Sequence, residues 1–281
     1  MLRIDTHQHL WNLDKVAYPW LIPDFGPIYR TFEASELEPQ LKAANIDKTV
    51  MVQSMNSYAD TDAMLENATN YEWICGVVGW VPIHDPVEAA RKLEEYTANP
   101  YFKGVRHLIH DETNPNWVVQ KQVFEGLKLL ADNNLTFDVV AVFPNHLKHV
   151  PSLAEKVPNL KIVIDHLAKP PLDPEQKQIW KEQLKAAAES PNVFAKLSGL
   201  NTTVPDFNNW TYEDIKPAID YALEVFGAER LMFGGDWPVA ILAGNYEMVV
   251  AETEKAIADL SDTEKEAIWQ NTANGFYNLG L

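Results

Sequence analysis

Short apolar runs alternate with amphipathic stretches along the whole chain, and this alternation limits its possible folds more than any other feature. The runs are rich in β-branched residues and mostly apolar, which is typical of strands buried on both faces. We predict eight such strands, at residues 2–6, 49–53, 74–81, 104–107, 136–140, 161–164, 193–197 and 231–234.

Helical patterns separate the predicted strands. A capping box, Ser35-Glu-Leu-Glu38, predicts the start of the first helix, and Asp173 opens a later one. Two more helices are expected after the last strand, near residues 246–260 and 262–278.

This series of β/α units predicts an α/β fold, a distorted TIM (β/α)8 barrel with an extra C-terminal helix. A doubly wound sheet is the alternative, but no Gly-x-Gly-x-x-Gly motif follows the first strand, and the crossovers have similar lengths. No low-complexity tract or long linker interrupts the chain, so we expect residues 1–281 to form a single domain.

The first predicted strand leads into the motif Asp-Thr-His-Gln-His-Leu-Trp. Residues two apart in an extended segment point to the same side, so His7 and His9 should face one place. Two convergent imidazoles suit a metal ion or a polar pocket. Trp11 opens a long aromatic loop, which is either a wall of a substrate site or a packed surface loop.

Active sites of TIM barrels lie where the strands end, so polar side chains at those positions are candidates for a site. Besides the two histidines, the candidates at or just after predicted strand ends include Gln53, Arg106, His107, Asp138, Asp165, His166, Lys196, Asp236 and Trp237.

Three of these residues carry specific chemistry. Asp236, in Phe-Gly-Gly-Asp-Trp-Pro, is a metal ligand or a general base, or else it caps a turn. His166 orients a substrate oxygen or a water, or it is a structural histidine. Arg106 binds a carbonyl or carboxylate, or it forms a salt bridge inside the barrel with Asp138 or Asp165.

Composition excludes some partners. The net charge of −17 makes nucleic acid and anionic membranes poor partners, and no apolar run approaches the ~18 residues that span a bilayer. We therefore expect a small-molecule substrate. The single cysteine, Cys75, rules out an internal disulfide and fits a reducing compartment, so we expect a cytoplasmic protein.

Five pieces of sequence, in order along the chain, resemble the amidohydrolase superfamily, and most closely its lactonase-like branch. That branch includes L-fuconolactonase, L-rhamnonolactonase and 2-pyrone-4,6-dicarboxylate lactonase. The pieces are Asp-Thr-His-Gln-His-Leu-Trp, Gly-Val-Arg-His, Asp-His-Leu-Ala-Lys-Pro, Lys-Leu-Ser-Gly-Leu and Phe-Gly-Gly-Asp-Trp-Pro.

The resemblance implies hydrolysis of a sugar-acid lactone or similar cyclic ester. It implies that Asp236 activates water, that His166 assists, and that Arg106 holds or polarises the lactone together with the two histidines of the first motif. We accordingly assign Asp236, His166 and Arg106 to catalysis. The residues assigned to substrate binding are His7, His9, Trp11, Gln53, His107 and Trp237.

The expected metal content is one divalent ion at most. Metal-rich members of the superfamily place a histidine at the end of the fifth strand, where this chain has Asp138. A single ion, zinc by preference, would be bound by His7, His9 and Asp236, and His166 is a further candidate ligand. A metal-free hydrolase is equally compatible with the sequence.

Two other functions remain open from the sequence. One is a metal-dependent decarboxylase or hydratase that acts on a small carboxylic acid and uses the same scaffold. The other is a barrel that binds a sugar acid without catalysis. The number of polar strand ends argues against an inert scaffold, because buried polar groups are costly without a role.

Overall fold

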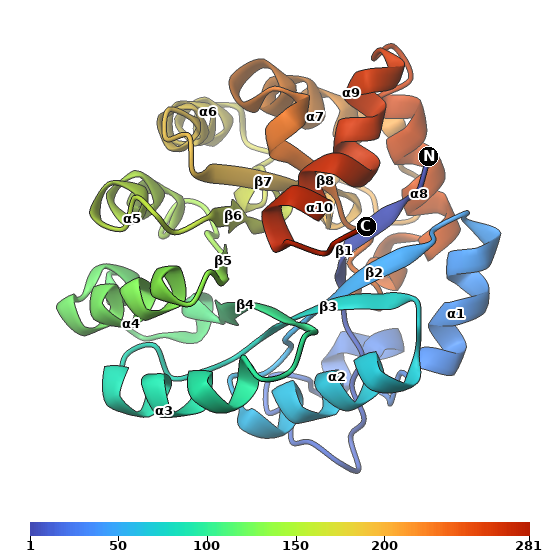
Figure 1. Ribbon diagram of the computed structural model, residues 1–281. Coiled ribbons are helices and arrows are strands. Elements are labelled where there is room, and N and C mark those ends of the chain that lie inside the picture. Colours follow the sequence, from blue (N-terminus) through green and yellow to red (C-terminus); the bar gives the residue numbers. More distant parts are fainter.

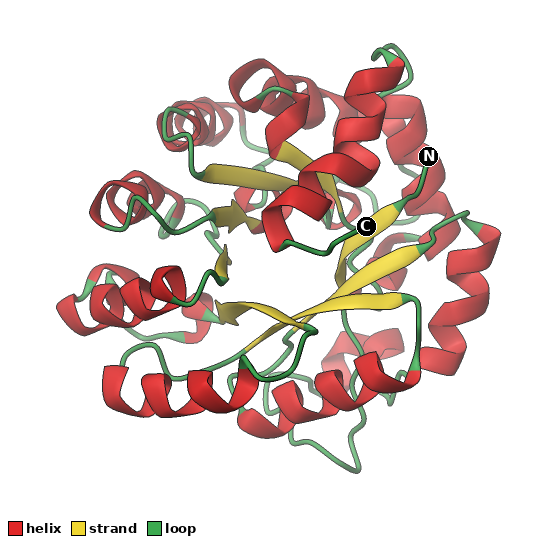
Figure 2. Cartoon of the chain, viewed as in Figure 1, coloured by secondary structure: helices red, strands yellow, loops and turns green.

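The computed structural model describes all 281 residues. Eight parallel strands form one sheet in the order of the sequence, and helices surround it (Figures 1 and 2). The strands are β1 (Ile4–Gln8), β2 (Lys48–Val52), β3 (Ile74–Gly79), β4 (Phe102–His107), β5 (Thr136–Val139), β6 (Ile162–Ile164), β7 (Val193–Leu197) and β8 (Leu231–Phe233). This is the predicted TIM barrel.

The sheet closes between β1 and β8. Gln8 and Trp237 form a parallel bridge, and the backbone N–H of His9 donates to the Trp237 carbonyl oxygen at 2.8 Å. The register shifts along three strand pairs, β1–β2, β2–β3 and β3–β4, which distorts the barrel. Strand β1 begins and ends two residues later than predicted, so His7 lies inside the strand.

Helices follow the strands around the barrel. They are α1 (Ala34–Ala43), α2 (Tyr58–Asn70), α3 (Pro86–Tyr96), α4 (Lys121–Asp132), α5 (Val150–Lys156), α6 (Pro174–Ala188), α7 (Tyr212–Phe226), α8 (Tyr246–Ala256), α9 (Asp262–Glu266) and α10 (Thr272–Tyr277). None of these helices has the length and apolar character that crossing a membrane requires.

The capping predictions had different outcomes. Asp173 caps α6 as expected, because its side chain accepts from the Gln176 N–H. The capping box at Ser35 was wrong. Helix α1 already begins at Ala34, and no side chain caps it. Ala34 and Leu37 are both buried on the inner face of this helix, so packing rather than a cap sets its start.

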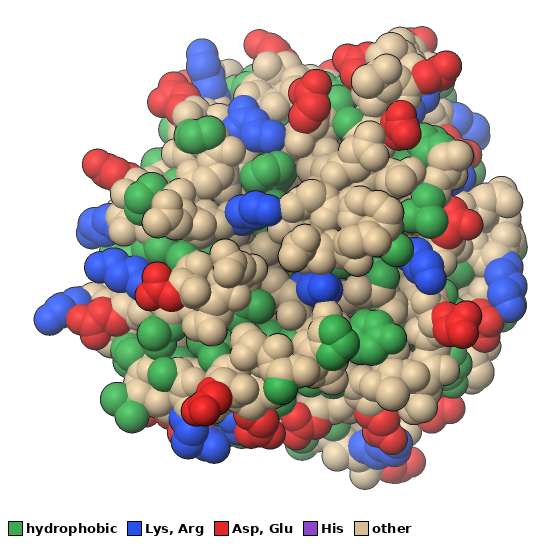
Figure 3. Space-filling model, in the orientation of Figure 1, with side chains coloured by type: hydrophobic (Ala, Val, Ile, Leu, Met, Phe, Trp, Pro, Cys, Tyr) green, Lys and Arg blue, Asp and Glu red, His purple; other side chains and the backbone are tan.

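The extra C-terminal helix is present as α10, and it lies across the end of the barrel that faces the viewer in Figure 1. Phe276 and Tyr277 are buried there against the inward-facing residues Ile4, Val50 and Met232. This end of the barrel is therefore filled by apolar side chains. Charged residues of both signs are interspersed on the same face (Figure 3). The buried polar side chains lie toward the other end, where the strands finish.

Candidate active site

A cavity of about 430 Å³ opens at the carboxyl ends of the strands. Polar residues from five strand ends contribute to it, and an apolar wall comes mainly from the aromatic loop after β1 and the loop after β8. Its lining includes His9, Trp11, Trp20, Phe25, Ser54, Arg106, His110, Asp111, His166, Lys169, Phe207, Asp236 and Leu242. The aromatic loop is thus a wall of the cavity, although parts of it also pack on the surface.

Asp236 lies just after β8, where its backbone N–H donates to the His7 carbonyl oxygen at 2.7 Å. Its own φ is 54°, an unusual left-handed conformation for a residue with a side chain. Burial raises the pKa of this carboxyl, but the charges and hydrogen bonds of His166, His9 and His7 outweigh burial. The pKa of Asp236 therefore lies well below its usual range, and the group is a carboxylate at neutral pH.

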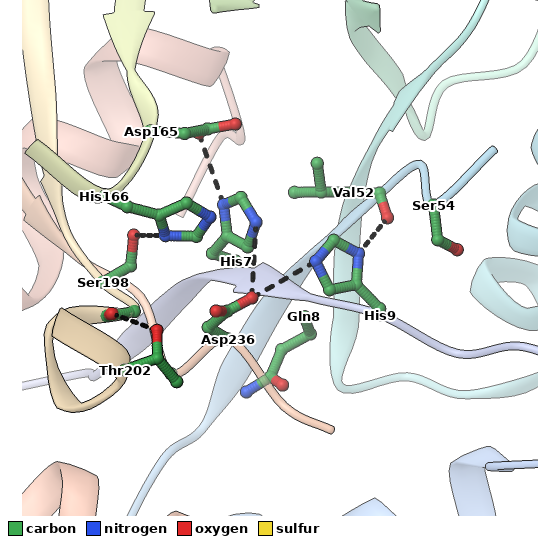
Figure 4. Close-up of polar contacts among 12 residues, drawn as sticks. His7, Gln8, His9, Val52, Ser54, Asp165, His166, Ser198, Thr202 and Asp236 are labelled. Atoms are coloured by element: carbon green, nitrogen blue, oxygen red, sulfur yellow. Dashed lines mark hydrogen bonds and ion pairs between the residues drawn. The ribbon is translucent and has the colours of Figure 1, made fainter. Parts of the chain in front are cut away.

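His9 approaches the carboxylate from β1 (Figure 4). Its Nδ1 atom lies 2.8 Å from the Val52 carbonyl oxygen, and its Nε2 atom lies 3.4 Å from Oδ1 of Asp236. A carbonyl oxygen only accepts hydrogen bonds, so Nδ1 carries the proton. The other ring nitrogen, Nε2, is the one that faces the carboxylate.

His7 lies beneath these groups and is fully buried. Its Nε2 atom is 3.8 Å from Oδ1 of Asp236, and its Nδ1 atom is 3.3 Å from Oδ1 of Asp165. Burial lowers the pKa of His7 well below its usual range, so the ring is neutral. The His7 and His9 ring centroids are 4.9 Å apart, which confirms that the two histidines face one place.

His166 follows β6 and has a φ of 55°. Its Nδ1 atom lies 2.8 Å from the Ser198 hydroxyl, and burial lowers the pKa of the ring to about 4. Gly199 makes room for this arrangement, because a Cβ atom there would lie 2.7 Å from Nδ1 of His166 and 3.0 Å from Oδ2 of Asp236. A glycine in the Lys-Leu-Ser-Gly-Leu motif is thus part of the site.

Arg106 forms the internal salt bridge that the sequence left as an alternative. Its Nη1 atom lies 3.1 Å from Oδ2 of Asp165 and 3.3 Å from Nε2 of His7. Its Nη2 atom donates to the backbone carbonyl oxygen of Gln53. The guanidinium lines the cavity, but most of its donors already have partners inside the barrel.

A second set of buried charges supports the site from below. Lys196 is fully buried, and its Nζ atom lies 2.5 Å from Oδ2 of Asp138 and 3.1 Å from Oδ1 of Asp165. Tyr277 of α10 donates to the same Asp138 oxygen at 2.7 Å. The sequence offered the two aspartates as alternative salt-bridge partners of Arg106 and placed Lys196 at a strand end. In the structure they form a buried network of charges below His7 and Arg106, and Asp165 contacts both of these residues.

Four residues assigned to substrate binding lie outside the cavity lining, and the first of them is the fully buried His7. Gln53 is buried and donates to Asn56 at 2.9 Å. His107 stacks on Trp117, with its centroid 4.0 Å from that ring. Trp237 is 1% exposed and packs among core residues. Their positions in the sequence correctly placed these residues near the ends of strands, but did not predict the direction of their side chains.

The site also includes residues that the sequence did not single out. Asp5 accepts from the backbone N–H groups of His7 and Gly235, each at 2.9 Å, and from Tyr246 at 2.7 Å. It thereby ties the first motif to the last one. Lys169 was noted only as part of a motif, yet it lines the cavity. Neither role has a sequence signal beyond proximity to the histidines.

The donor set fits one divalent cation. Ligand atoms of His7, His166 and Asp236 all lie within 4.8 Å of one another, and Nε2 of His9 faces the same carboxylate. Neutral imidazoles and a carboxylate are ligands that zinc prefers, and the contact between Nδ1 of His9 and a backbone carbonyl is typical of metal-binding histidines. The cluster thus contains His166, which the sequence named as a further candidate ligand, while His9 lies beside it at the same carboxylate.

Comparison with known proteins identifies the family. The Amidohydrolase family profile matches residues 4–279. An L-fucono-1,5-lactonase of Burkholderia ambifaria is 34% identical over 247 residues, which cover 87% of this chain and 83% of the relative. An L-fucono-1,5-lactonase of Burkholderia multivorans is 33% identical over 288 residues, covering 99% and 96%.

Solved structures give the same result. A crystal structure of an amidohydrolase from Burkholderia multivorans with bound zinc has a TM-score of 0.89 at 32% identity and covers 99% of both chains. A 5-carboxyvanillate decarboxylase from Novosphingobium aromaticivorans, with manganese, has a TM-score of 0.71 at 17% identity, covering 99% and 96%. The second likeness shows the fold alone. By the profile and the relatives together, this chain belongs to the amidohydrolase family.

Proposed function

We propose that this protein hydrolyses a sugar-acid lactone, with Asp236 as the base that activates water. The observation that carries the proposal is an ionised carboxylate in the lining of a substrate-sized cavity, surrounded by three histidines. A carboxylate of this kind can take a proton from a water molecule placed beside it. The lactonase names of the two Burkholderia relatives support the same reaction class.

The reaction needs one proton transfer in each direction. Asp236 takes a proton from water, and the resulting hydroxide attacks the lactone carbonyl carbon. His166, whose Nδ1 is held by Ser198, has Nε2 left to contact the oxyanion that forms. The bond between the carbonyl carbon and the ring oxygen then breaks, and the ring oxygen takes the proton that Asp236 had accepted. The product is an open-chain hydroxy acid.

A divalent ion bound by His7, His166 and Asp236, with His9 beside them, would polarise the carbonyl and lower the pKa of a bound water. Because Ser198 holds Nδ1 of His166, its Nε2 would bind the ion or contact the oxyanion, but not both. His7 and His9 lie against the carboxylate, and Arg106 and Asp165 fix the His7 ring.

The cavity supports a sugar-derived substrate. Trp11, Trp20 and Phe25 contribute flat apolar surfaces, and Ser54, His110 and Asp111 contribute hydrogen-bonding groups. A sugar ring has an apolar C–H face and a polar rim of hydroxyls, so it matches both parts of this lining. The ring size and the stereochemistry of the hydroxyls would be selected by these groups.

The test is a panel of aldonolactones and muconolactones, with acid release followed in weakly buffered solution. Purified protein is measured as isolated, after chelation, and after zinc is restored. We expect saturable hydrolysis of at least one aldonolactone. Absence of turnover across the panel in all three states contradicts the proposal. Release of carbon dioxide from aromatic or aliphatic carboxylic acids would instead support the decarboxylase alternative.

A further inference from the structure

Lys169 is the one lysine in the cavity lining, and its side chain is unpaired. No carboxylate lies within 4.0 Å of its Nζ atom, and Nζ makes no hydrogen bond within the protein. Most other lysines near polar groups in this chain have such partners, among them Lys196, Lys216 and Lys255. An ammonium group therefore faces the substrate space uncompensated.

The backbone holds Lys169 in place through an unusual turn. His166, Leu167, Ala168 and Lys169 have φ values of 55°, 48°, 62° and 56°, so four successive residues other than glycine are left-handed. Each such residue is less stable than in the right-handed conformation, because its Cβ atom crowds the following carbonyl oxygen. Strained backbone of this kind persists when its surroundings determine it, and it concentrates at functional sites.

The surroundings of this turn do determine it. Leu167 and Ala168 are buried, and the Leu167 carbonyl oxygen accepts from the indole of Trp180 at 2.8 Å. The backbone N–H of Lys169 donates to the His166 carbonyl oxygen, also at 2.8 Å. In a helical turn of three residues, side chains three positions apart lie on the same side. His166 and Lys169 accordingly line the same cavity.

The lactone reaction leaves one charge without a partner among the groups described so far. As the ring bond breaks, negative charge develops on the ring oxygen before it takes the proton from Asp236. Arg106 is engaged with Asp165, His7 and Gln53. His166 is held through Nδ1 by the Ser198 hydroxyl at 2.8 Å, and its Nε2 is already assigned to the carbonyl oxyanion.

We propose that Lys169 is a further catalytic residue, whose ammonium donates a hydrogen bond to the departing ring oxygen; this role rests on the proposed lactonase function. The proton balance is unchanged. Water gives one proton to Asp236, Asp236 gives it to the ring oxygen, and Lys169 remains protonated throughout. Its exposed position lets it follow the oxygen as the ring opens.

The test compares Lys169→Met and Lys169→Arg with the wild type on the best lactone of the panel. Loss of one preorganised donor to a developing oxyanion lowers kcat by about 10²- to 10³-fold. We expect a loss of this size in the methionine variant with KM changed less than about threefold, and partial recovery in the arginine variant. Lys185→Met, on the exposed surface of α6, is the matched control and should keep wild-type rates.

A second measurement separates leaving-group stabilisation from general effects. The corresponding thiolactone expels a thiolate, which gains little from a hydrogen bond, so Lys169→Met should lose much less on it than on the lactone. Wild-type kcat in the methionine variant, a rise of KM alone, or equal losses on lactone and thiolactone would overturn the inference. Failure of the wild type to hydrolyse any lactone would instead overturn the proposed function itself.

Discussion

Nε2 of His9 lies 3.4 Å from Oδ1 of Asp236, while Nδ1 of the same ring is committed to the Val52 carbonyl oxygen. Two atoms that only accept hydrogen bonds thus face one another in the neutral form of the ring. A stable arrangement needs a hydrogen atom or a cation between them. This pair therefore marks the place where a water molecule or a metal ion belongs.

The residue at the end of β5 predicts the number of metal ions that each chain binds. Asp138 occupies the position where a second-metal histidine would be expected, and its carboxylate is already bonded to Lys196 and Tyr277. We predict at most one zinc ion per chain after reconstitution and removal of excess metal, measured by mass spectrometry of the protein. A stoichiometry of two ions per chain would show that this account of β5 is wrong.

The close approach at Gly199 predicts an activity defect. Gly199→Ala would place a methyl group 2.7 Å from His166 and 3.0 Å from Asp236, at a φ of +59°. Displacement of catalytic groups by about 1 Å can cost 10²-fold in rate, so we expect kcat to fall by about that factor. Gly275→Ala, where a Cβ meets nothing within 4 Å, serves as the control. Equal rates for the two variants would refute the role given to Gly199.

The buried lysine predicts a large stability effect. Lys196→Met would leave Asp138 and Asp165 without their shared cation in the barrel interior. Removal of one partner of a buried ion pair costs about 3–5 kcal/mol, which urea denaturation at neutral pH would measure. Lys121→Met removes an exposed lysine on α4 and should have little effect. A Lys196→Met midpoint equal to that of the control would contradict the structure.

His107 predicts part of the pH dependence of stability. The indole N–H of Trp80 donates to its Nδ1 atom at 3.1 Å, so Nε2 carries the proton and donates to Glu112 at 2.7 Å. Burial lowers the pKa of His107 from 6.5 to about 4. Because the folded pKa lies below the unfolded one, this histidine contributes stability above pH 6.5 and loses it as the pH falls toward 4.

The size of the effect is about 2 kcal/mol between pH 7.5 and pH 5 for this one group. His107→Gln lacks this titration. Between pH 7.5 and pH 5, its free energy of unfolding should therefore fall by about 2 kcal/mol less than that of the wild type. Urea titrations at the two pH values give the comparison. Parallel losses in both proteins would mean that His107 does not titrate as described.

Much of the fold was predictable from the sequence, because strands buried on both faces leave a strong apolar signal. Strand β7 has the predicted bounds, and the other strands differ by one or two residues at their ends. The start of α1 was not predictable from its cap residues, since the burial of Ala34 and Leu37 decided it. Such tertiary contacts have no local sequence signal.

The candidate site was predictable in part. Strand-end position brought His7, His9, His166 and Asp236 together as expected, and the structure groups them. The left-handed turn that carries Lys169 was not predictable, because it contains no glycine and depends on burial of its middle residues. The partners of Arg106 were likewise left open, because the sequence does not show whether Asp138 or Asp165 lies nearer to its guanidinium.

The most direct test of the central claim is the rate of Asp236→Asn on the best lactone. Asparagine keeps the shape of the side chain but cannot take a proton from water, so kcat should fall by about 10²- to 10⁴-fold. Asp111→Asn, at another carboxylate of the same cavity, is the matched control and should lose far less. A thermal midpoint close to wild type would show that the fold is intact. Near-wild-type turnover by a folded Asp236→Asn protein would contradict the assignment of Asp236 as the base.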